Sequence, residues 1–353
     1  MLFCNHNKFA CFLALLLLGV AAMALFYLCC CVGGLSKKKR SPRSFGKNIY
    51  KRDWKTGQDG GAFDDSQAAD STMALARHAR ALMTKGHYLM MGSPKLGQGR
   101  FSTVRLIRKR DGRLAAAKIV ELKSKVVADF KTFAYRERET WRKLAHRNVV
   151  RLHEYFETGG LLVLICELAN SGTIYDYVRN NGPTEEARAA SWLVQILRGM
   201  LYMHGEGVCH RDLKLDNLLL ADEGKRVLIG DFTFSRFMAG GALTDTICGT
   251  AEYSAPEVLE GRPHDPFKSD VWSIGICFYA IVTARLPFRD EKGRREELLA
   301  KQRQLSALPF PEGTPYLLKQ MINGHLLTRD PAQRPTLHQV AQHPYWRCLQ
   351  AQK

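Results

Sequence analysis

Apolar and polar positions are arranged along the chain in blocks that predict a membrane helix, a polar spacer and a folded domain. Residues 9–32 contain no charged side chain, and as a helix this stretch would be about 36 Å long, enough to cross a bilayer core. Residues 36–87 are polar and contain several glycines, which is typical of a flexible tether. Within this spacer, Asp70 or Ser71 could cap a short helix that continues through Met83.

After the spacer, the hydrophobic period changes from segment to segment, which predicts a domain with both strands and helices. The apolar runs at 114–120 and 163–168 predict strands, and the stretch 130–146 predicts a helix between them. Apolar side chains at helical spacing predict a second helix at 185–203. The long apolar run at 271–282 predicts a buried helix.

The net charge of the chain predicts an anionic binding partner. The chain has a formal net charge of +18, which favours anionic partners such as phosphate-bearing ligands, acidic lipids or nucleic acids. A basic cluster directly follows the apolar segment, and it favours a membrane surface. No motif that reads nucleic acid accompanies it, so we expect contact with membrane lipid and no nucleic-acid partner. We also expect a monomer. The cluster consists of Lys37, Lys38, Lys39, Arg40 and Arg43.

The charges on either side of residues 9–32 also predict a topology. Only Lys8 and the amino terminus are basic before this segment, so the positive-inside rule places residues 1–8 outside the cytosol and the rest of the chain inside it. A cleaved signal peptide is one alternative, but its apolar stretch is normally about 7–15 residues and follows its positive charge. A buried helix of a soluble protein is the other alternative.

The ten cysteines do not indicate a disulfide framework, because half of them lie in or beside the apolar segment. Cys29, Cys30 and Cys31 are either candidates for reversible S-acylation or simply small apolar residues of a helix. The other five are scattered and lack metal-ligand spacing, which predicts reduced thiols in a cytosolic domain and no zinc site.

Candidate chemistry begins with a glycine-rich string, LGQGRFSTV. Gly97 and Gly99 lie between two strand-like runs, where bare backbone can close over phosphate groups, although such hairpins are common and the string alone is a weak signal. Lys118 lies in the next apolar strand, where an unpaired ammonium would be costly. Glu137 on the following helix is a suitable partner. Glu139 points about 200° away around that helix and cannot share the role.

The strings CHRDLKLDNLLL and IGDFTFSR carry the most specific signal. Together they resemble the eukaryotic protein kinases, a likeness that implies ATP and magnesium as substrate and cofactor. It implies that Asp212 receives the proton of the substrate hydroxyl and that Lys214 contacts the phosphate. Asn217 and Asp231 would hold magnesium ions. Phosphoryl transfer spreads charge over several oxygens, and magnesium and lysine offset that charge while the hydroxyl is aligned.

Three further strings follow in the order that this family requires: AEYSAPE, DVWSIG and DPAQRP. The resemblance implies a buried ion pair between Glu257 and Arg334, and a bracing role for Asp270 at the catalytic loop. It also implies an α+β bilobal protein kinase fold, with a small lobe of antiparallel sheet and one helix, a larger helical lobe, and ATP in the cleft. The expected organisation is an extracytosolic N-terminus (1–8), a transmembrane helix (9–32), a basic juxtamembrane linker (33–87), a kinase domain (88–346) and a short tail (347–353).

The resemblance further implies how ATP is held. The backbone groups of Glu167 and Leu168 would meet adenine at the hinge between the lobes, and Cys166 would guard the pocket behind it. The residues expected to contact or position ATP are Gly97, Gly99, Ser102, Val104, Lys118, Glu137, Glu167 and Leu168.

Two features favour serine and threonine hydroxyls as substrates: Lys214, and the Gly-Thr pair before the APE string. The surrounding stretch resembles the calcium/calmodulin-kinase-like group and is similar to the testis-specific serine/threonine kinases. Thr246 lies where this family carries an activating phosphate, with Arg211 and Arg236 as its expected partners. An unmodified loop threonine is the alternative.

Two departures from the family pattern bear on activity. Ser102 replaces the usual third glycine of the phosphate loop, which is a mild change, and Thr233 replaces the usual glycine of the DFG string. A β-branched residue narrows the choice of backbone conformations, so Thr233 could bias the magnesium loop although Asp231 remains. The alternatives to an active kinase are a membrane-anchored pseudokinase that binds nucleotide or partners, and a basic membrane adaptor whose kinase-like fold is incidental.

Overall fold

The computed structural model describes most of the chain from residue 65 onward. The predicted membrane segment, its cysteines and the basic cluster therefore lie outside the described residues. Among the helices that are described, none combines the length and the apolar composition needed to cross a membrane. The described ranges are 65–84, 88–99, 102–122, 130–239, 241–290, 294–304 and 307–351.

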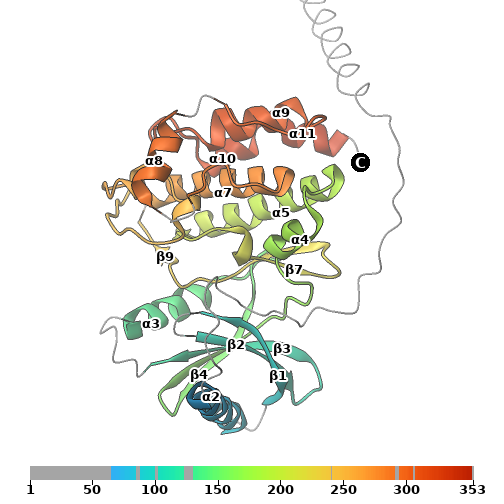
Figure 1. Cartoon of the computed structure of the whole chain (residues 1–353), viewed down its shortest axis with the longest axis vertical. Coiled ribbons are helices and arrows are strands. Elements are labelled where there is room, and N and C mark those ends of the chain that lie inside the picture. Colours follow the sequence, from blue (N-terminus) through green and yellow to red (C-terminus); the bar gives the residue numbers. More distant parts are fainter. Residues whose placement is uncertain are drawn as a thin grey trace, which may run out of the picture. The chain divides into compact units, whose positions relative to one another are not determined.

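An antiparallel sheet of five strands forms the small lobe (Figure 1). Its strand order is β1-β2-β3-β5-β4, and all neighbouring strands are antiparallel. In the turn between β2 and β3, Gly112 has a φ of 84°, a left-handed conformation that glycine adopts without strain. The strands are β1 (Tyr88–Gln98), β2 (Ser102–Lys109), β3 (Leu114–Glu121), β4 (Leu152–Thr158) and β5 (Leu161–Cys166).

Both faces of this sheet are covered, as β3 shows residue by residue. Ala115, Ala117 and Ile119 belong to one hydrophobic cluster, whereas Ala116 and Val120 belong to another. Successive side chains of a strand point to opposite faces, so a strand covered on both sides needs a continuous apolar run. This is why the string LAAAKIV contains a single polar side chain.

Helix α3 (Phe130–Trp141) and helix α2 (Asp65–Thr84) supply the two covers. Ala81 and Leu82 of α2 are buried in the same cluster as alternate residues of β3. The short helix expected to continue through Met83 is thus a helix of 20 residues that packs against the sheet. The described residues of the small lobe therefore form two helices rather than the one expected, because α2 removes an apolar sheet face from water.

The large lobe is built around α7 (Pro266–Thr283), whose side chains are buried along most of its length. A helix that is apolar on all sides is typical of a protein interior, and the buried helix predicted at 271–282 is confirmed. The side chain of Asp265 caps its first turn by accepting a backbone hydrogen bond. At Gly275 the chain comes close to a neighbouring segment, since a Cβ there would lie 2.7 Å from Leu327.

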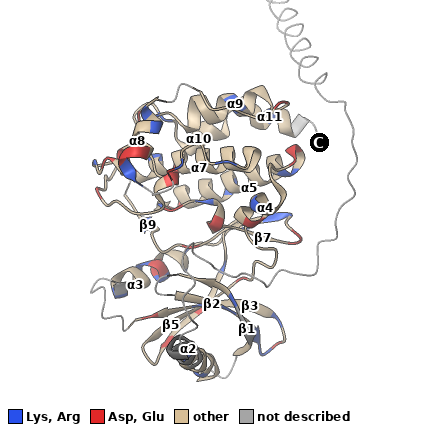
Figure 2. Cartoon of the chain, in the orientation of Figure 1, with Lys and Arg blue, Asp and Glu red and all other residues tan. Residues whose placement is uncertain are grey.

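The other helices of the large lobe include α5 (Glu186–Gly205), which packs against α7 and confirms the helix predicted at 185–203. Helix α8 has two acidic residues in its first turn and two basic residues in its last, an order that suits the helix dipole (Figure 2). The remaining helices are α4 (Ile174–Asn181), α6 (Pro256–Leu259), α8 (Arg295–Gln304), α9 (Tyr316–Gln320), α10 (Leu337–Ala341) and α11 (Pro344–Ala351).

Two short strand pairs of the large lobe hold the loops that matter for function. Strand β6 (Val208–Cys209) pairs with β9 (Arg236–Phe237), and β7 (Leu218–Ala221) pairs with β8 (Arg226–Ile229). The loop from β6 to β7 and the loop from β8 to β9 are therefore tied together at both ends. The expected two-lobed α+β fold, with a small antiparallel sheet and a larger helical lobe, is confirmed.

Candidate active site

A buried ion pair joins Lys118 on β3 to Glu137 on α3. Nζ of Lys118 lies 2.5 Å from Oε1 of Glu137, and the two residues are only 9% and 2% exposed. The predicted pairing is confirmed, and Glu139 instead pairs with Arg142 at 2.6 Å. Burial by itself would lower the pKa of Lys118, but the carboxylates of Asp231 and Glu137 outweigh burial and raise this pKa. The ammonium therefore keeps its charge.

Asp212 and Lys214 lie in the loop from β6 to β7. Nζ of Lys214 is 3.2 Å from Oδ2 of Asp212. The amide Nδ2 of Asn217 donates a hydrogen bond to the backbone carbonyl of Asp212 at 2.8 Å. Asp212 is buried, so the contact with Lys214 holds its carboxylate and the bond from Asn217 holds its backbone. The structure thus brings together the two residues that the resemblance assigns to catalysis.

Thr250 completes this group, although the sequence offers it only as an indicator of substrate class. Its backbone N–H and its hydroxyl both donate to Oδ1 of Asp212 at 2.9 Å, and Lys214 donates to its Oγ1 at 2.8 Å. Gly249 beside it has a φ of 89°, and a Cβ there would lie 2.5 Å from the carbonyl oxygen of Arg211. Glycine is therefore required for this close approach. We call Asp212, Lys214, Asn217 and Thr250 the catalytic cluster.

Asp270, near the start of α7, braces the catalytic loop as the resemblance implies. Its carboxylate accepts hydrogen bonds from the backbone N–H groups of His210 at 2.7 Å and Arg211 at 2.8 Å, and it lies 3.0 Å from Nε2 of His204. Burial would raise the pKa of Asp270, but the interaction with His204 helps to hold it below its usual value. These bonds support Arg211 in a left-handed conformation with a φ of 67°, which is uncommon for a residue other than glycine.

Asn217 and Asp231, the residues expected to hold magnesium, lie in the two loops that the strand pairs tie together. Burial would raise the pKa of Asp231, but the charge of Lys118 and the hydroxyl of Thr233 outweigh burial and keep the carboxylate ionised. Since Nδ2 of Asn217 is engaged, its Oδ1 is the atom suited to a metal ion. A carboxylate with an amide oxygen fits magnesium, which prefers oxygen ligands. Within the described ranges, no three His, Cys, Asp or Glu side chains form a metal site.

The glycine-rich residues lie at one end of the β1-β2 hairpin. Gly97 pairs with Val104 across the two strands. The backbone N–H of Gly99 donates to the carbonyl of Ser102 at 2.8 Å, which closes the hairpin end. Val104 is in turn the neighbour of Lys118 on β3, so the hairpin lies beside the strand that carries the buried lysine.

Glu167 and Leu168 follow β5, at the connection from the small lobe to the large one. The Glu167 carboxylate pairs with Arg226 at 2.6 Å, and its backbone N–H donates to the carbonyl of Arg151 at 2.9 Å. A contact of Glu167 with adenine would therefore fall to its carbonyl oxygen. Leu168 is partly buried against the main core. Burial raises the pKa of the Cys166 thiol to about 12, as expected for a residue of the core.

Thr246 lies exposed in the segment between β9 and α6. A guanidinium nitrogen of Arg211 donates to its backbone carbonyl at 3.3 Å, and the hydroxyls of Thr244 and Thr246 are 3.2 Å apart. Arg236 lies in β9 opposite Cys209, and in the described part of the chain no hydrogen bond joins its side chain to Thr246. The structure thus brings one of the two expected arginines to Thr246, and phosphorylation there stays a prediction that mass spectrometry of active protein can check.

The segment from Asp231 to Glu257, which we call the activation segment, is anchored at its end by Arg334. Two guanidinium nitrogens of Arg334 donate to the two carboxylate oxygens of Glu257, at 2.7 and 3.0 Å. Arg334 also donates to three backbone carbonyls and lies 5.2 Å from the centre of the Trp272 ring. The two charged residues are 0% and 1% exposed. The predicted buried pair is confirmed.

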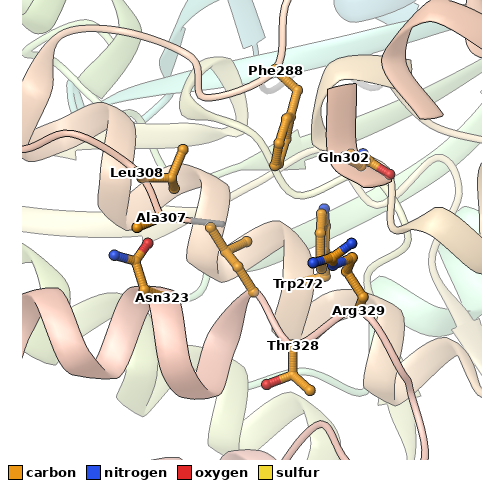
Figure 3. A pocket seen from close by; sticks show the side chains of 9 residues that line it. Trp272, Phe288, Gln302, Ala307, Leu308, Asn323, Thr328 and Arg329 are labelled. Carbon is orange, nitrogen blue, oxygen red and sulfur yellow. The ribbon is translucent and has the colours of Figure 1, made fainter. Parts of the chain in front are cut away.

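A cavity of about 250 Å³ lies in the large lobe, and none of its lining residues belongs to the catalytic cluster (Figure 3). Trp272 and Phe288 stack beside it with ring centres 5.8 Å apart. Nε1 of Trp272 and Oε1 of Gln302 are buried without a hydrogen-bond partner in the described part of the chain, and ordered water commonly satisfies such groups. Nε2 of Gln302 donates to the carbonyl of Ser254 at 3.0 Å, so one residue that lines the cavity contacts the activation segment.

The fold and the site together define an ATP-dependent phosphotransferase. A buried lysine, held by a glutamate of the small lobe, faces an ionised aspartate of the large lobe beside the catalytic cluster. A sequence model of the protein kinase domain matches residues 92–346. The chain belongs to the protein kinase family.

Individual relatives agree with this assignment. The chain is 34% identical over 268 residues to testis-specific serine/threonine-protein kinase 3 of Mus musculus, an overlap that covers 75% of this chain and 97% of that protein. It is 35% identical over 254 residues to serine/threonine-protein kinase SIK1 of Mus musculus, covering 70% of this chain and 31% of that protein. The chain is thus a serine/threonine protein kinase, with ATP as substrate and magnesium as cofactor, from the group that the sequence resembles.

Proposed function

We propose that this kinase transfers the γ-phosphate of ATP to protein serine and threonine hydroxyls through Asp212, from an anchored position at the cytosolic side of a membrane. One observation carries the catalytic part. Lys118 of the small lobe and Asp231 of the large lobe are 113 positions apart in the chain, yet Nζ and Oδ1 lie 3.1 Å apart. This contact supports the proposal, in which Lys118 binds phosphate and Asp231 binds the metal ion, because phosphoryl transfer requires two such groups beside each other.

In the proposed mechanism, Asp212 aligns the substrate hydroxyl and accepts its proton as the hydroxyl oxygen forms a bond to the γ-phosphorus. The bond from that phosphorus to the β–γ bridging oxygen breaks, and ADP leaves. Lys214 lies beside the carboxylate of Asp212 and would offset the charge on the phosphoryl group during its transfer. Thr250 holds one oxygen of Asp212 and so keeps the carboxylate oriented. Lys118, held by Glu137, would bind oxygens of the remaining phosphates. The chain thus acts mainly by positioning charge, which is where most of the catalysis of phosphoryl transfer comes from.

The residues present also fit the two bound groups. Oδ1 of Asn217 and the carboxylate of Asp231 would hold magnesium, which when bound offsets the charge of the phosphates. Gly97 and Gly99 would close over the phosphates because they have no side chains to obstruct the backbone. The carbonyl of Glu167 would meet adenine at the hinge.

The catalytic proposal is tested by a transfer assay with full-length protein, radiolabelled ATP and a general protein substrate. We expect labelled phosphoserine and phosphothreonine from the wild type, and a large loss of label with Asp231→Asn, which removes a metal-binding charge but retains the size of the side chain. Asp222→Asn, which alters an exposed carboxylate outside the site, serves as the matched control. Wild-type label no greater than that of Asp231→Asn would favour a pseudokinase scaffold instead.

The membrane proposal rests on the uncharged stretch 9–32 and on the basic cluster that follows it. Because the charge difference across the stretch determines orientation, we expect wild-type protein to stay in the membrane pellet after alkaline carbonate extraction, with its kinase domain degraded by protease added from the cytosolic side. A chain lacking residues 1–32 should be released by the extraction. Release of the wild type, or protection of its kinase domain, would contradict the proposal.

A further inference from the structure

Thr233 occupies the position where this family usually has the glycine of the DFG string, and its hydroxyl joins two residues of the site. Oγ1 of Thr233 donates to Oδ1 of Asp231 at 2.7 Å and accepts a hydrogen bond from Nζ of Lys118 at 3.0 Å. Lys118 also donates to the same Oδ1 at 3.1 Å. The three side chains therefore form a closed triangle of hydrogen bonds.

The two carboxylate oxygens of Asp231 differ in their hydrogen-bond partners. Oδ1 accepts from both Thr233 and Lys118, whereas no hydrogen bond from the described residues reaches Oδ2. An ionised carboxylate can only accept, with roughly two sites on each oxygen. Oδ2 is therefore the oxygen with full capacity for a metal ion, and the partners of Oδ1 set the rotation of the carboxylate.

The backbone accommodates threonine at this position without strain. Of Asp231, Phe232 and Thr233, it is Asp231 that has a positive φ, 60°, and Thr233 is not among the described residues with a positive φ. Phe232 between them is fully buried, with its ring centre 5.2 Å from that of Trp141. A β-branched side chain on a backbone held in this way has few rotamers, so its hydroxyl is confined to a small region.

We propose that Thr233 is a positioning residue for phosphoryl transfer, whose hydroxyl holds Oδ1 of Asp231 and leaves Oδ2 for the magnesium ion. The inference rests on the proposed function of Asp231. The three N–H groups of Lys118 are all used, by Glu137, Asp231 and Thr233. When Lys118 turns a donor toward a phosphate oxygen, the partners that remain on Oδ1 are the Thr233 hydroxyl at 2.7 Å and, at a longer 3.4 Å, the backbone N–H of Thr233. The residue that departs from the family pattern thus supports metal binding.

The test measures how binding of a fluorescent ATP analogue to full-length protein depends on magnesium concentration. Thr233→Val removes the hydroxyl but keeps the branched shape, and Thr233→Ser keeps the hydroxyl. Loss of a group that orients a metal ligand typically costs about 10–100-fold in metal affinity, so we expect the valine variant to need about tenfold more magnesium for half-maximal binding. The serine variant and Thr158→Val, the same change outside the site, should behave like the wild type.

A wild-type magnesium requirement in Thr233→Val would overturn the inference, and so would a serine variant as impaired as the valine one. If the valine variant does not fold, Thr233→Gly also removes the hydroxyl, and a wild-type requirement in that variant would overturn the inference equally. The readout is independent of catalysis. Protein that shows the hydroxyl dependence but transfers no phosphate would support the role of Thr233 while refuting the proposed catalytic function.

Discussion

Replacing Asp212 with asparagine is expected to lower the turnover number for phosphoryl transfer by about 10²–10⁴-fold, the usual contribution of a general base. The amide cannot take the proton of the substrate hydroxyl, but it has the same size and can still accept a hydrogen bond from Thr250. The affinity for ATP should change little, because Asp212 contacts Lys214 and Thr250 and has no assigned contact with the nucleotide. Initial rates at varied ATP concentration separate the two quantities.

Glu312→Gln is the control for the Asp212 variant, because it removes an exposed carboxylate on the large lobe. It should retain both wild-type turnover and the wild-type melting temperature. An Asp212→Asn protein that melts like the wild type and turns over at the wild-type rate would contradict the assigned role. A melting temperature well below that of the wild type would instead show that Asp212 serves mainly to hold the loop.

Arg334→Met is expected to have the largest effect on stability. It leaves the Glu257 carboxylate buried without its charged partner, and breaking a buried pair in this way costs about 3–5 kcal/mol in the free energy of unfolding. Methionine fills much of the space of the arginine stem, so the effect comes mostly from the lost charge and hydrogen bonds. Urea unfolding followed by circular dichroism measures the loss.

Arg303→Met offers a matched comparison for this stability effect. Arg303 pairs with Glu260 at 2.8 Å, but its side chain is 67% exposed, and exposed pairs typically contribute about 0–1 kcal/mol. The same substitution should therefore cost several times less at position 303 than at position 334. Equal losses in the free energy of unfolding at the two positions would contradict the claim that burial determines how much the Glu257 pair contributes to stability.

The catalytic arrangement is one connected set of contacts rather than separate motifs. Phe232 is fully buried between Trp141 of α3, at 5.2 Å between ring centres, and His210 of the catalytic loop, at 6.0 Å. The backbone of His210 is in turn held by Asp270 of α7. A helix of the small lobe, the activation segment and the central helix of the large lobe are therefore linked through a few side chains. A substitution at any of these positions should therefore change the position of Asp231.

Several of these contacts could be predicted from the sequence alone. Lys118 lies in an apolar strand, so its ammonium needed a carboxylate, and helix geometry allowed Glu137 but not Glu139 to reach it. The family resemblance implied the pair of Glu257 with Arg334. Both pairs are present. The local sequence was enough to predict these two pairs. An apolar strand followed by a helix indicated the first pair, and the family motifs implied the second.

Other features could not be predicted, because they depend on which segments meet in space. The sequence indicates a short helix before the kinase domain, but nothing in it shows that Leu82 is buried against the sheet. Thr250 carries a family signal, yet its bonds to Asp212 exist only because the activation segment folds back onto the catalytic loop. The stretch 9–32 lies outside the described residues, so its membrane role still rests on the sequence.

Thr233 shows most clearly which properties can be predicted from the sequence and which depend on the fold. The class of fold, the order of the motifs and the identity of the charged residues follow from the amino-acid sequence, since hydrophobic period and motif spacing are local properties of a chain. The sequence also identifies Thr233 as a departure from the family, with an unknown effect on the magnesium loop. The position of its hydroxyl between Lys118 and Asp231 follows from the three-dimensional fold, because a hydrogen bond between residues distant in sequence requires that packing first bring them within about 3 Å.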